Sequence, residues 1–380
     1  MAAHLRPWAD LHADLFLPIV DRLRSLRDCI AVRCVCTAWR SALPPGPRSP
    51  YLLVLHAFQP YDGGLPRFNT HAYALSLPMQ RTFRLPTLAC HSNDITCSGY
   101  GYLTIADGRR LGLLNPVTGK EIELLPLRNM RYPHRIVLRP NPRPDDYTAV
   151  AICGHDNVNK VMSKVAYMTS GDTKWTITDI TSDGSKLVDL VYKHNDVYCL
   201  DEHGGVQVLH IPVPQGGRMK ERNVYPLLPE RVVGTPFDTP IAPPYDTVAK
   251  EISFKRLFFC EGILYQVWQN TRQTIQFLLR EGGVFIMSSD EILVLRYYPE
   301  RWPCWEAVKD LGGYSVFIGR NNTAVVQAEA TPGVRPNCVY WIDCGLCTPW
   351  VFDMSNKTST HCVRPPCGVG FARCWYFNDS

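Results

Sequence analysis

The residues of this sequence that could do chemistry are mainly cysteines and histidines. Cys344 and Cys347 are separated by two residues, Cys362 and Cys367 by four, and His361 directly precedes the second pair. Thiolate and imidazole groups at such spacings are typical zinc ligands. Cysteine is abundant throughout the chain, with 15 residues, and prolines lie close to both pairs. We therefore favour loop ends over metal ligands here, and a zinc-binding domain is the lesser alternative.

The segment 112–121, GLLNPVTGKE, has glycines and a lysine as a phosphate-binding loop does. It has six residues between its glycines, whereas that loop has four, and Glu121 stands where Ser or Thr would hold magnesium. The chain also has no Gly-x-Ser-x-Gly turn and no His-x-x-x-His pair beside a glutamate. The sequence therefore favours a non-catalytic protein without a cofactor. A site assembled from residues far apart in the chain is the alternative.

Composition and charge favour a soluble intracellular protein. The 40 basic and 35 acidic residues give a net charge of +5 without a long basic block, so we expect no nucleic-acid partner. No secretory signal follows Met1, and no run of about 18 apolar residues predicts a membrane span. We expect a cytoplasmic or nuclear protein, or one found in both, whose odd number of cysteines act as reduced, small hydrophobic residues.

Residues 11–43 show the clearest helical periodicity of the chain. An apolar residue recurs every four positions at Leu11, Leu15, Ile19 and Leu23. Ser25 and Asp28 form a capping-box pattern that predicts the start of a second helix. One face of that helix carries Cys29, Val32, Val35, Cys36 and Trp39. Because helices this short are marginal in water, we expect them to dock, either as a cap on the rest of the chain or on a partner.

From Tyr51 onward the sequence consists of short β-rich runs separated by Gly, Pro, Asn and Asp, which predicts an all-β domain. Similar units recur at a period of roughly 45 to 55 residues, which fits propeller blades better than one sandwich or barrel. We expect six or seven blades, with C-terminal strands closing the ring. The blades are predicted near residues 51–85, 88–128, 135–181, 186–229, 252–306 and 312–353.

Two features of this β-rich region could serve binding. The stretch 212–245 is rich in proline and charge, and it is either a long functional loop between blades or a disordered linker. The chain also has 9 Trp and 18 Tyr residues. Most of them are expected in blade cores, whereas those on loops at one rim would anchor a protein partner.

The apolar pattern of the helical stretch resembles the F-box, the module by which substrate receptors attach to the adaptor subunit of SCF-type cullin–RING ubiquitin ligases. The matching positions run through both predicted helices: Leu11, Leu15, Phe16, Ile19, Val20, Leu23, Leu26, Val32, Val35, Cys36 and Trp39. The resemblance implies adaptor-binding residues at Leu11, Leu15, Ile19, Leu23, Val35 and Trp39.

The helical stretch departs from the F-box pattern at two positions. His12 stands where that family usually has proline, and Pro18 falls inside the first predicted helix. A proline there removes a hydrogen bond and crowds the carbonyl group of Asp14, at a cost of about 3 kcal/mol. We therefore expect a kinked helix or a helix that starts late.

Two further stretches resemble the KIB-type β-propeller domain of plant F-box proteins, formerly a domain of unknown function. They are LLNPVTGKEIELLPL at 113–127, and WEAVKDLGGYSVFIGRNN at 305–322 with RPNCVYWIDC at 335–344. In the first stretch, Asn115-Pro116 and Gly119 predict a tight turn between two strands, because Asn can bond its own backbone and Gly supplies a positive φ. These motifs are expected to hold blades together rather than to bind a ligand.

The sequence thus predicts a mainly β protein with a small α module at its N-terminus. We assign an F-box-like helical module to residues 8–44, a Pro-rich linker to 45–50, and a KIB-type propeller with the insertion near 212–245 to 51–380. The resemblance implies a non-catalytic substrate-recognition subunit that binds the adaptor, and through it cullin, by the F-box and an unknown target protein by the propeller. The alternatives are a propeller scaffold without ubiquitin-ligase activity and, less favoured, an enzyme or zinc-binding propeller.

Overall fold

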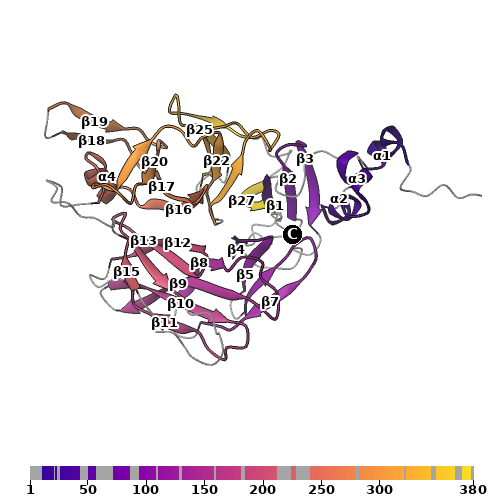
Figure 1. The fold of residues 1–380 in the computed structure, drawn as a ribbon, viewed down its shortest axis with the longest axis horizontal. Coiled ribbons are helices and arrows are strands. Elements are labelled where there is room, and N and C mark those ends of the chain that lie inside the picture. The colour runs from indigo at the N-terminus through magenta and orange to yellow at the C-terminus, as the bar shows by residue number, and fades with distance from the viewer. Residues whose placement is uncertain are drawn as a thin grey trace, which may run out of the picture.

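The structure is a computed structural model of the chain, and most of the residues that it describes lie in β-sheets (Figure 1). It describes residues 11–20, 22–23, 26–42, 50–56, 72–85, 94–107, 110–127, 131–157, 160–180, 185–211, 224–227, 240–279, 282–320, 322–343, 348–363 and 370–377. The linker predicted at 45–50 therefore lies outside the described residues except for its last position, and so does most of the insertion predicted near 212–245.

The described residues contain the helices α1 (Ala13–Val20), α2 (Leu26–Arg33), α3 (Thr37–Ala42) and α4 (Tyr245–Glu251). Helix α1 begins at Ala13 and contains Pro18, so this proline lies inside the helix and does not delay its start, and the kink stays a prediction. The prediction of one continuous second helix is wrong. The amide groups of Cys34 and Val35 bond to carbonyl groups three residues earlier, which tightens the last turn of α2 and ends it before α3.

The strands form six sheets of four or five strands, together with one two-stranded hairpin. The first two sheets, in spatial order, are β27 (Gly370–Phe377), β1 (Pro50–His56), β2 (Ala72–Ser76) and β3 (Arg81–Leu85), then β4 (Asp94–Gly99), β5 (Tyr102–Asp107), β6 (Arg110–Leu114) and β7 (Glu121–Leu124). The next two are β8 (Arg131–Leu138), β9 (Thr148–Asn157), β10 (Lys160–Thr169) and β11 (Thr176–Thr178), then β12 (Leu187–Lys193), β13 (Asp196–Asp201), β14 (Val206–His210) and β15 (Val224–Pro226).

The fifth sheet contains β16 (Phe254–Cys260), β17 (Ile263–Gln269), β20 (Ile292–Tyr297) and β21 (Trp305–Val308), and the hairpin of β18 (Ile275–Leu278) and β19 (Val284–Met287) extends from it. The sixth has the order β23 (Ala324–Gln327), β22 (Tyr314–Phe317), β24 (Cys338–Ile342), β25 (Pro349–Asp353) and β26 (Thr358–His361). Each sheet lies within or close to one predicted blade range, except that the first sheet also contains the C-terminal strand β27. The predicted propeller is confirmed, with six blades.

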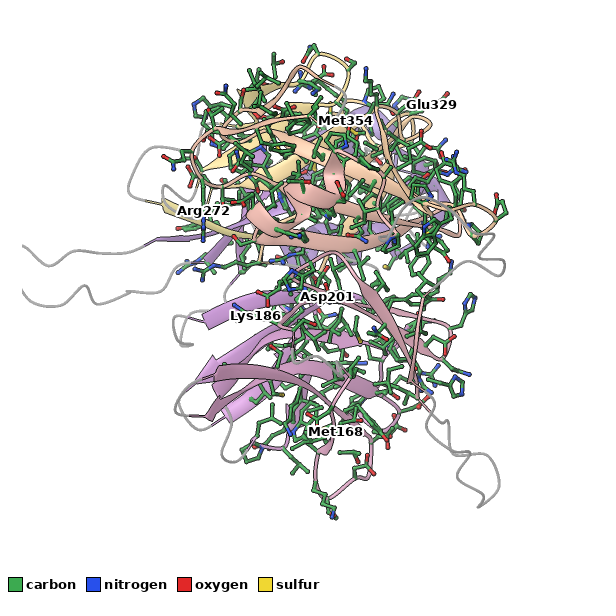
Figure 2. All side chains as sticks on the ribbon, turned by 90° about the vertical axis from the view of Figure 1, so that its left-hand side faces the viewer. Met168, Lys186, Asp201, Arg272, Glu329 and Met354 are labelled. Carbon is green, nitrogen blue, oxygen red and sulfur yellow. The ribbon has the colours of Figure 1, made fainter. Side chains whose placement is uncertain are left out.

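The core of the molecule lies between neighbouring sheets rather than within one central layer. Six clusters of buried apolar side chains are present, and each joins two adjacent sheets of the ring. Figure 2, turned by 90° from Figure 1, shows these side chains filling the space between the sheets. Both faces of each sheet are therefore covered, which explains why many strands are apolar on both sides instead of alternating.

Strand β27 closes the ring, as expected for the C-terminal segment. It pairs antiparallel with β1, so that Tyr376 lies opposite Tyr51 and Trp375 opposite Leu52. The indole of Trp375 is fully buried and packs edge-on against Phe317 of the neighbouring blade, with ring centroids 5.1 Å apart. Residues from the two ends of the chain thus belong to one sheet and share its core.

Buried polar groups tie the inner strands of three blades together. The guanidinium Nε of Arg135 on β8 lies 2.6 Å from Oδ1 of Asp189 on β12. The other carboxylate oxygen of Asp189 accepts a hydrogen bond of 2.7 Å from the backbone N–H of Leu257 on β16. Because both charged side chains are almost completely buried, removal of either partner would leave an uncompensated charge in the centre of the ring.

The turn predicted at 115–119 is confirmed and joins β6 to β7. Oδ1 of Asn115 accepts hydrogen bonds from the backbone N–H groups of Val117 and Thr118, at 3.0 and 2.9 Å. Gly119 has a φ of 73°, and its N–H group donates to the carbonyl oxygen of Asn115 over 2.8 Å. The motif that resembles a phosphate loop in composition is therefore a structural turn between β6 and β7.

We expect Trp375→Ala to lower the free energy of unfolding by about 3–5 kcal/mol, because it leaves a cavity where the two ends of the chain meet. The measurement is equilibrium unfolding in guanidinium chloride. Leu278→Ala, at an exposed position of β18, serves as the control and should change the free energy by less than about 0.5 kcal/mol. A loss below about 1 kcal/mol for Trp375→Ala would contradict the closure of the ring by β27.

Alkaline pH should destabilise the fold through buried thiols. Burial raises the pKa of Cys260, Cys304 and Cys338 to about 11 and that of Cys153 to about 12. Above about pH 9 these thiols ionise in the unfolded chain but not in the folded one, so the unfolded state binds fewer protons and stability falls. Burial lowers the pKa of Lys255 to about 8 and also lowers that of Lys193, and these two groups act in the opposite direction.

The denaturation midpoint should therefore decrease between about pH 9 and 11. Cys153→Ala and Cys260→Ala should each reduce this slope, because each removes one thiol whose ionisation opposes folding. A midpoint that stays constant or increases over the same interval would contradict the prediction.

Candidate protein-binding surfaces

Large apolar side chains that are exposed to solvent gather in two places among the described residues. One group is Leu15, Ile19 and Val35 in the N-terminal helical segment, and the other is Leu278, Val284 and Ile286 in the β18–β19 hairpin, whereas Ile177 in β11 belongs to neither. Contiguous apolar surface of this kind marks interaction sites in soluble proteins. Both clusters project from the propeller, at opposite ends of the molecule (Figure 1).

The predicted adaptor-binding residues fall into two groups. Leu15 and Ile19 lie one helical turn apart on α1 and are 63% and 48% exposed, and Val35 in the turn between α2 and α3 is 57% exposed. Leu11 and Leu23 flank α1 and are half-buried. Trp39 is also half-buried, and its ring lies 4.5 Å from that of Phe16, so it belongs to the core of the helices themselves.

The opposite face of the helices is buried. Phe16, Val20 and Leu26 are almost completely covered, and Leu26 joins the apolar cluster of the first sheet. Arg81 at the start of β3 donates hydrogen bonds to the carbonyl oxygens of Val20 and Leu23, at 3.4 and 2.5 Å. The two interpretations of this segment are therefore compatible, because its inner face caps a blade while Leu15, Ile19 and Val35 remain exposed.

The β18–β19 hairpin also has one packed face and one exposed face. Phe277 and Phe285 stack at 5.1 Å on one face, and Phe285 also contacts Tyr245 of α4. On the other face Leu278 lies opposite Val284, and these side chains are exposed. The hairpin thus offers an apolar surface of the same residue types as the helices, at a different place in the fold.

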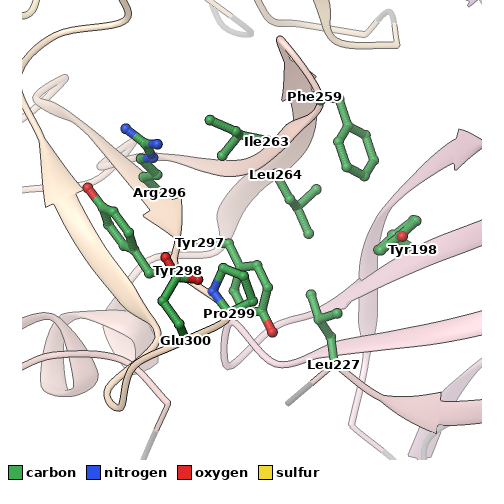
Figure 3. A pocket seen from close by; sticks show the side chains of 11 residues that line it. Tyr198, Leu227, Phe259, Ile263, Leu264, Arg296, Tyr297, Tyr298, Pro299 and Glu300 are labelled. Carbon is green, nitrogen blue, oxygen red and sulfur yellow. The ribbon is translucent and has the colours of Figure 1, made fainter. Parts of the chain in front are cut away.

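An aromatic groove opens between the fourth and fifth sheets, with a volume of about 370 Å³. It is lined by Tyr198, Leu227, Phe259, Gly262, Ile263, Leu264, Arg296, Tyr297, Tyr298, Pro299 and Glu300. In Figure 3, Arg296 and Tyr298 lie on one side, Phe259 and Tyr198 on the other, and Leu264 and Tyr297 between them. Four aromatic side chains, Tyr198, Phe259, Tyr297 and Tyr298, are gathered here, and the expectation that Trp and Tyr residues on rim loops anchor a partner stays a prediction.

Cations in contact with aromatic rings border this groove. The Nζ atom of Lys193 lies 3.9 Å from the centroid of the Phe259 ring and donates to the carbonyl oxygen of Gly262. Burial lowers the pKa of Lys193. The guanidinium carbon of Arg296 lies 4.9 Å from the centroid of the Tyr298 ring. Such arrangements hold the cations in position while leaving donor groups for a partner.

A second cavity, of about 260 Å³, lies on the axis of the ring, because inner strands of all six sheets contribute to it. Its lining is mainly apolar and includes Gly99, Val137, Leu190, Leu257, Val325 and Phe377. The hydroxyl groups of Tyr192 and Thr323 also line it and have no hydrogen-bond partner among the described residues. A polar pair in such a cavity is a suitable place for ordered water.

The predicted zinc alternative falls largely outside the described residues, because Cys344, Cys347 and Cys367 do. His361 stacks on Trp350, with ring centroids 3.8 Å apart. Within the part of the chain that the structure describes, no group of three or more His, Cys, Asp or Glu residues is arranged to hold a metal ion. In the same part, no helix has the length and apolar character to cross a membrane.

The family model described as KIB1-4 beta-propeller matches residues 74–364 of this sequence. The chain belongs to the KIB1-4 beta-propeller family. The match contains both stretches, 113–127 and 305–344, that resemble this domain in the sequence. Strands of all six sheets lie in the matched range, whereas α1, α2 and α3 lie before it.

Solved structures resemble this KIB1-4 propeller only distantly. A chain of the S. cerevisiae Dbp5–Nup159–Gle1 structure is 8% identical, with coverage of 83% of this chain and 96% of that chain and a TM-score of 0.33. The Cps50 (Swd1) β-propeller domain of Myceliophteria_thermophila is 10% identical, with coverage of 82% and 96% and a TM-score of 0.33. The tricorn protease is 12% identical, with a TM-score of 0.32, and 84% of this chain matches 32% of that chain. No curated protein matches the sequence.

Two substitutions should detach the N-terminal helices from the KIB1-4 propeller without disturbing the blades. We expect Leu26→Ala combined with Arg81→Ala to accelerate amide hydrogen exchange in residues 11–42 by at least about tenfold, because the variant removes the buried anchor and the hydrogen bonds to Val20 and Leu23. Exchange in β9 and β10 should not change. The control is Lys164→Ala, at a surface ion pair of β10, and it should leave residues 11–42 protected. Equal exchange rates of residues 11–42 in the two variants would contradict the docking of the helices through Leu26 and Arg81.

Proposed function

We propose that this protein is the substrate-recognition subunit of an SCF-type cullin–RING ubiquitin ligase. The observation that supports this proposal is the apolar face of the N-terminal helices, formed by Leu15, Ile19 and Val35, at positions that match the F-box pattern. The adaptor subunit binds this face and links the chain to cullin. The propeller binds a target protein.

The division of the helices into two faces suits such a role. The inner face is held by Leu26 and Arg81, so that the exposed face has a defined position relative to the propeller. Each large apolar side chain that becomes buried in a complex contributes about 1.5–3 kcal/mol. Three such residues, with Leu11 and Leu23 at the edges, therefore suffice for a specific contact of moderate affinity.

The chain contributes proximity and no catalytic group of its own. Binding of the target to the propeller raises the effective concentration of the target's lysines near a ubiquitin thioester carried elsewhere on the ligase. In this proposal the protein acts in the cytoplasm, the nucleus or both, it needs no cofactor, and it engages neither nucleic acid nor membranes.

A propeller scaffold without ubiquitin-ligase activity is the second candidate. Pro18 favours it, because this residue lies within α1, next to Ile19, and removes a backbone hydrogen bond from the helix that would contact the adaptor. Both candidates share target binding by the propeller and differ in adaptor binding alone.

Retention of the adaptor by the purified full-length chain separates the two candidates. We expect the wild-type chain to retain it in a pull-down, and Leu15→Asp combined with Ile19→Asp to reduce its affinity at least about 100-fold, because two carboxylates would be buried in an apolar contact. Leu278→Asp combined with Ile286→Asp is the matched control, since these residues are 80% and 56% exposed on the hairpin. It should retain the adaptor. Failure of the wild-type chain to bind, or equal binding by the helix variant, would favour the scaffold.

A further inference from the structure

The groove between the fourth and fifth sheets is built from two independent blades. Tyr198 of β13 and Leu227, which follows β15, form one wall. The other wall comes from the β16–β17 turn and from the residues at the end of β20, including Arg296 and Tyr298. A ligand that occupies the groove would therefore contact both blades at once.

The floor of the groove is apolar and already packed. Leu264 is buried, and the ring of Tyr297 lies 5.2 Å from that of the buried Trp305. On one side of the groove, the rings of Tyr198 and Phe259, which come from different blades, meet edge to face with centroids 5.0 Å apart. Aromatic side chains held by such contacts lose little conformational entropy when a partner binds, so the site is preformed.

Arg296 is the polar group that this packing leaves available. Its guanidinium group contacts the Tyr298 ring, and its Nε atom is buried without a hydrogen-bond partner. Among the described residues no carboxylate pairs with it, whereas the neighbouring Arg301 pairs with Glu306 and covers the same Tyr298 ring at 3.3 Å. Arginine forms its strongest contacts with carboxylate or phosphate oxygens. Arg296 therefore has the chemistry to receive an anion.

Acidic residues near Arg296 limit where that anion can lie, and one of them, Glu306, lies opposite Arg296 in the pairing of β20 with β21 and is paired with Arg301. Glu300 is exposed at the rim of the groove, on the Pro299 side (Figure 3). Glu261 lies in the β16–β17 turn and accepts a hydrogen bond of 2.8 Å from the hydroxyl group of Tyr314. A uniformly acidic ligand would be repelled by these groups, so the groove favours one anionic side chain at Arg296 and neutral or basic neighbours elsewhere.

We propose that this groove binds a linear segment of a partner protein in which an apolar side chain lies next to a single anionic side chain. The apolar side chain packs on Leu264 and Tyr297, and the anionic group, a carboxylate or a phosphate, pairs with Arg296. The assignment of the groove as the site that selects the target rests on the proposed receptor function. The volume of about 370 Å³ lies near the lower end of the range for ligand pockets, which suits one or two side chains of a peptide.

Binding to a synthetic peptide array tests this proposal with the full-length chain. The probes are nine-residue peptides with a central Leu or Phe, and the flanking positions carry Asp, phosphoserine, Gln or Lys in turn. Peptides with one Asp or one phosphoserine should bind at least about tenfold more tightly than the Gln peptides. The Asp and phosphoserine arms show which source of the anion the groove accepts.

Substitutions at the groove make the test specific. Arg296→Gln should remove the preference for Asp over Gln, and Arg296→Glu should reverse it in favour of Lys. Phe259→Ala should weaken all apolar peptides alike. The matched control is Arg301→Gln. This variant also removes a guanidinium group from the Tyr298 ring, but that group already has a carboxylate partner in Glu306. The control should change affinities less than about twofold.

Absence of binding across the array, or a preference for Asp that survives Arg296→Gln and Arg296→Glu, would overturn the proposal. Adaptor retention is measured on the same preparations. The groove variants should retain the adaptor as the wild-type chain does, because the groove and the helices belong to different blades. A wild-type chain that binds peptides but not the adaptor would refute the receptor function and leave the groove assignment intact.

Discussion

The pairing of β1 with β27 is the interaction on which the rest of the structure depends. Each blade covers both of its faces with neighbouring blades, so an open ring would expose two apolar faces to water at the break. The closure brings Trp375 and Tyr376 into the sheet that begins at Pro50, and the apolar clusters on both sides of this sheet contain residues from each end of the chain. The free energy of closure is therefore shared by distant parts of the sequence, which makes cooperative folding the expected behaviour.

Closure also determines where the helices lie. Leu26 packs into the cluster formed by the closing sheet, and Arg81 of β3 binds the carbonyl groups at the end of α1 and beyond it. A helix as short as α1 would be marginal in isolation. Its docking on this blade stabilises it despite Pro18, and the same docking sets which residues face solvent. The exposed face of Leu15, Ile19 and Val35 is thus a consequence of how the inner face is held.

Blades that radiate from an axis separate toward the outside of the ring, and the aromatic groove lies where two of them diverge. Near the axis the two blades are in direct contact, because the backbone N–H of Leu257 on β16 donates to the carboxylate of Asp189 on β12. Farther out, Tyr198 and Phe259 meet across the gap but leave a hollow beside them. The guanidinium group of Arg296 at this hollow has no carboxylate partner among the described residues, whereas that of Arg301 nearby is paired, and the proposed binding role of the groove is argued from this contrast.

The sequence by itself determined the local features: the short strands, the turn at Asn115 and Gly119, the period of the blades and the amphipathic helices. Each of these depends on residues only a few positions apart. The tertiary structure decided the number of blades, the end of α2 before Val35, and the assembly of the groove from Tyr198 and Arg296, which are about a hundred residues apart. No local pattern encodes such contacts, because side chains from separate blades meet only after the ring has closed.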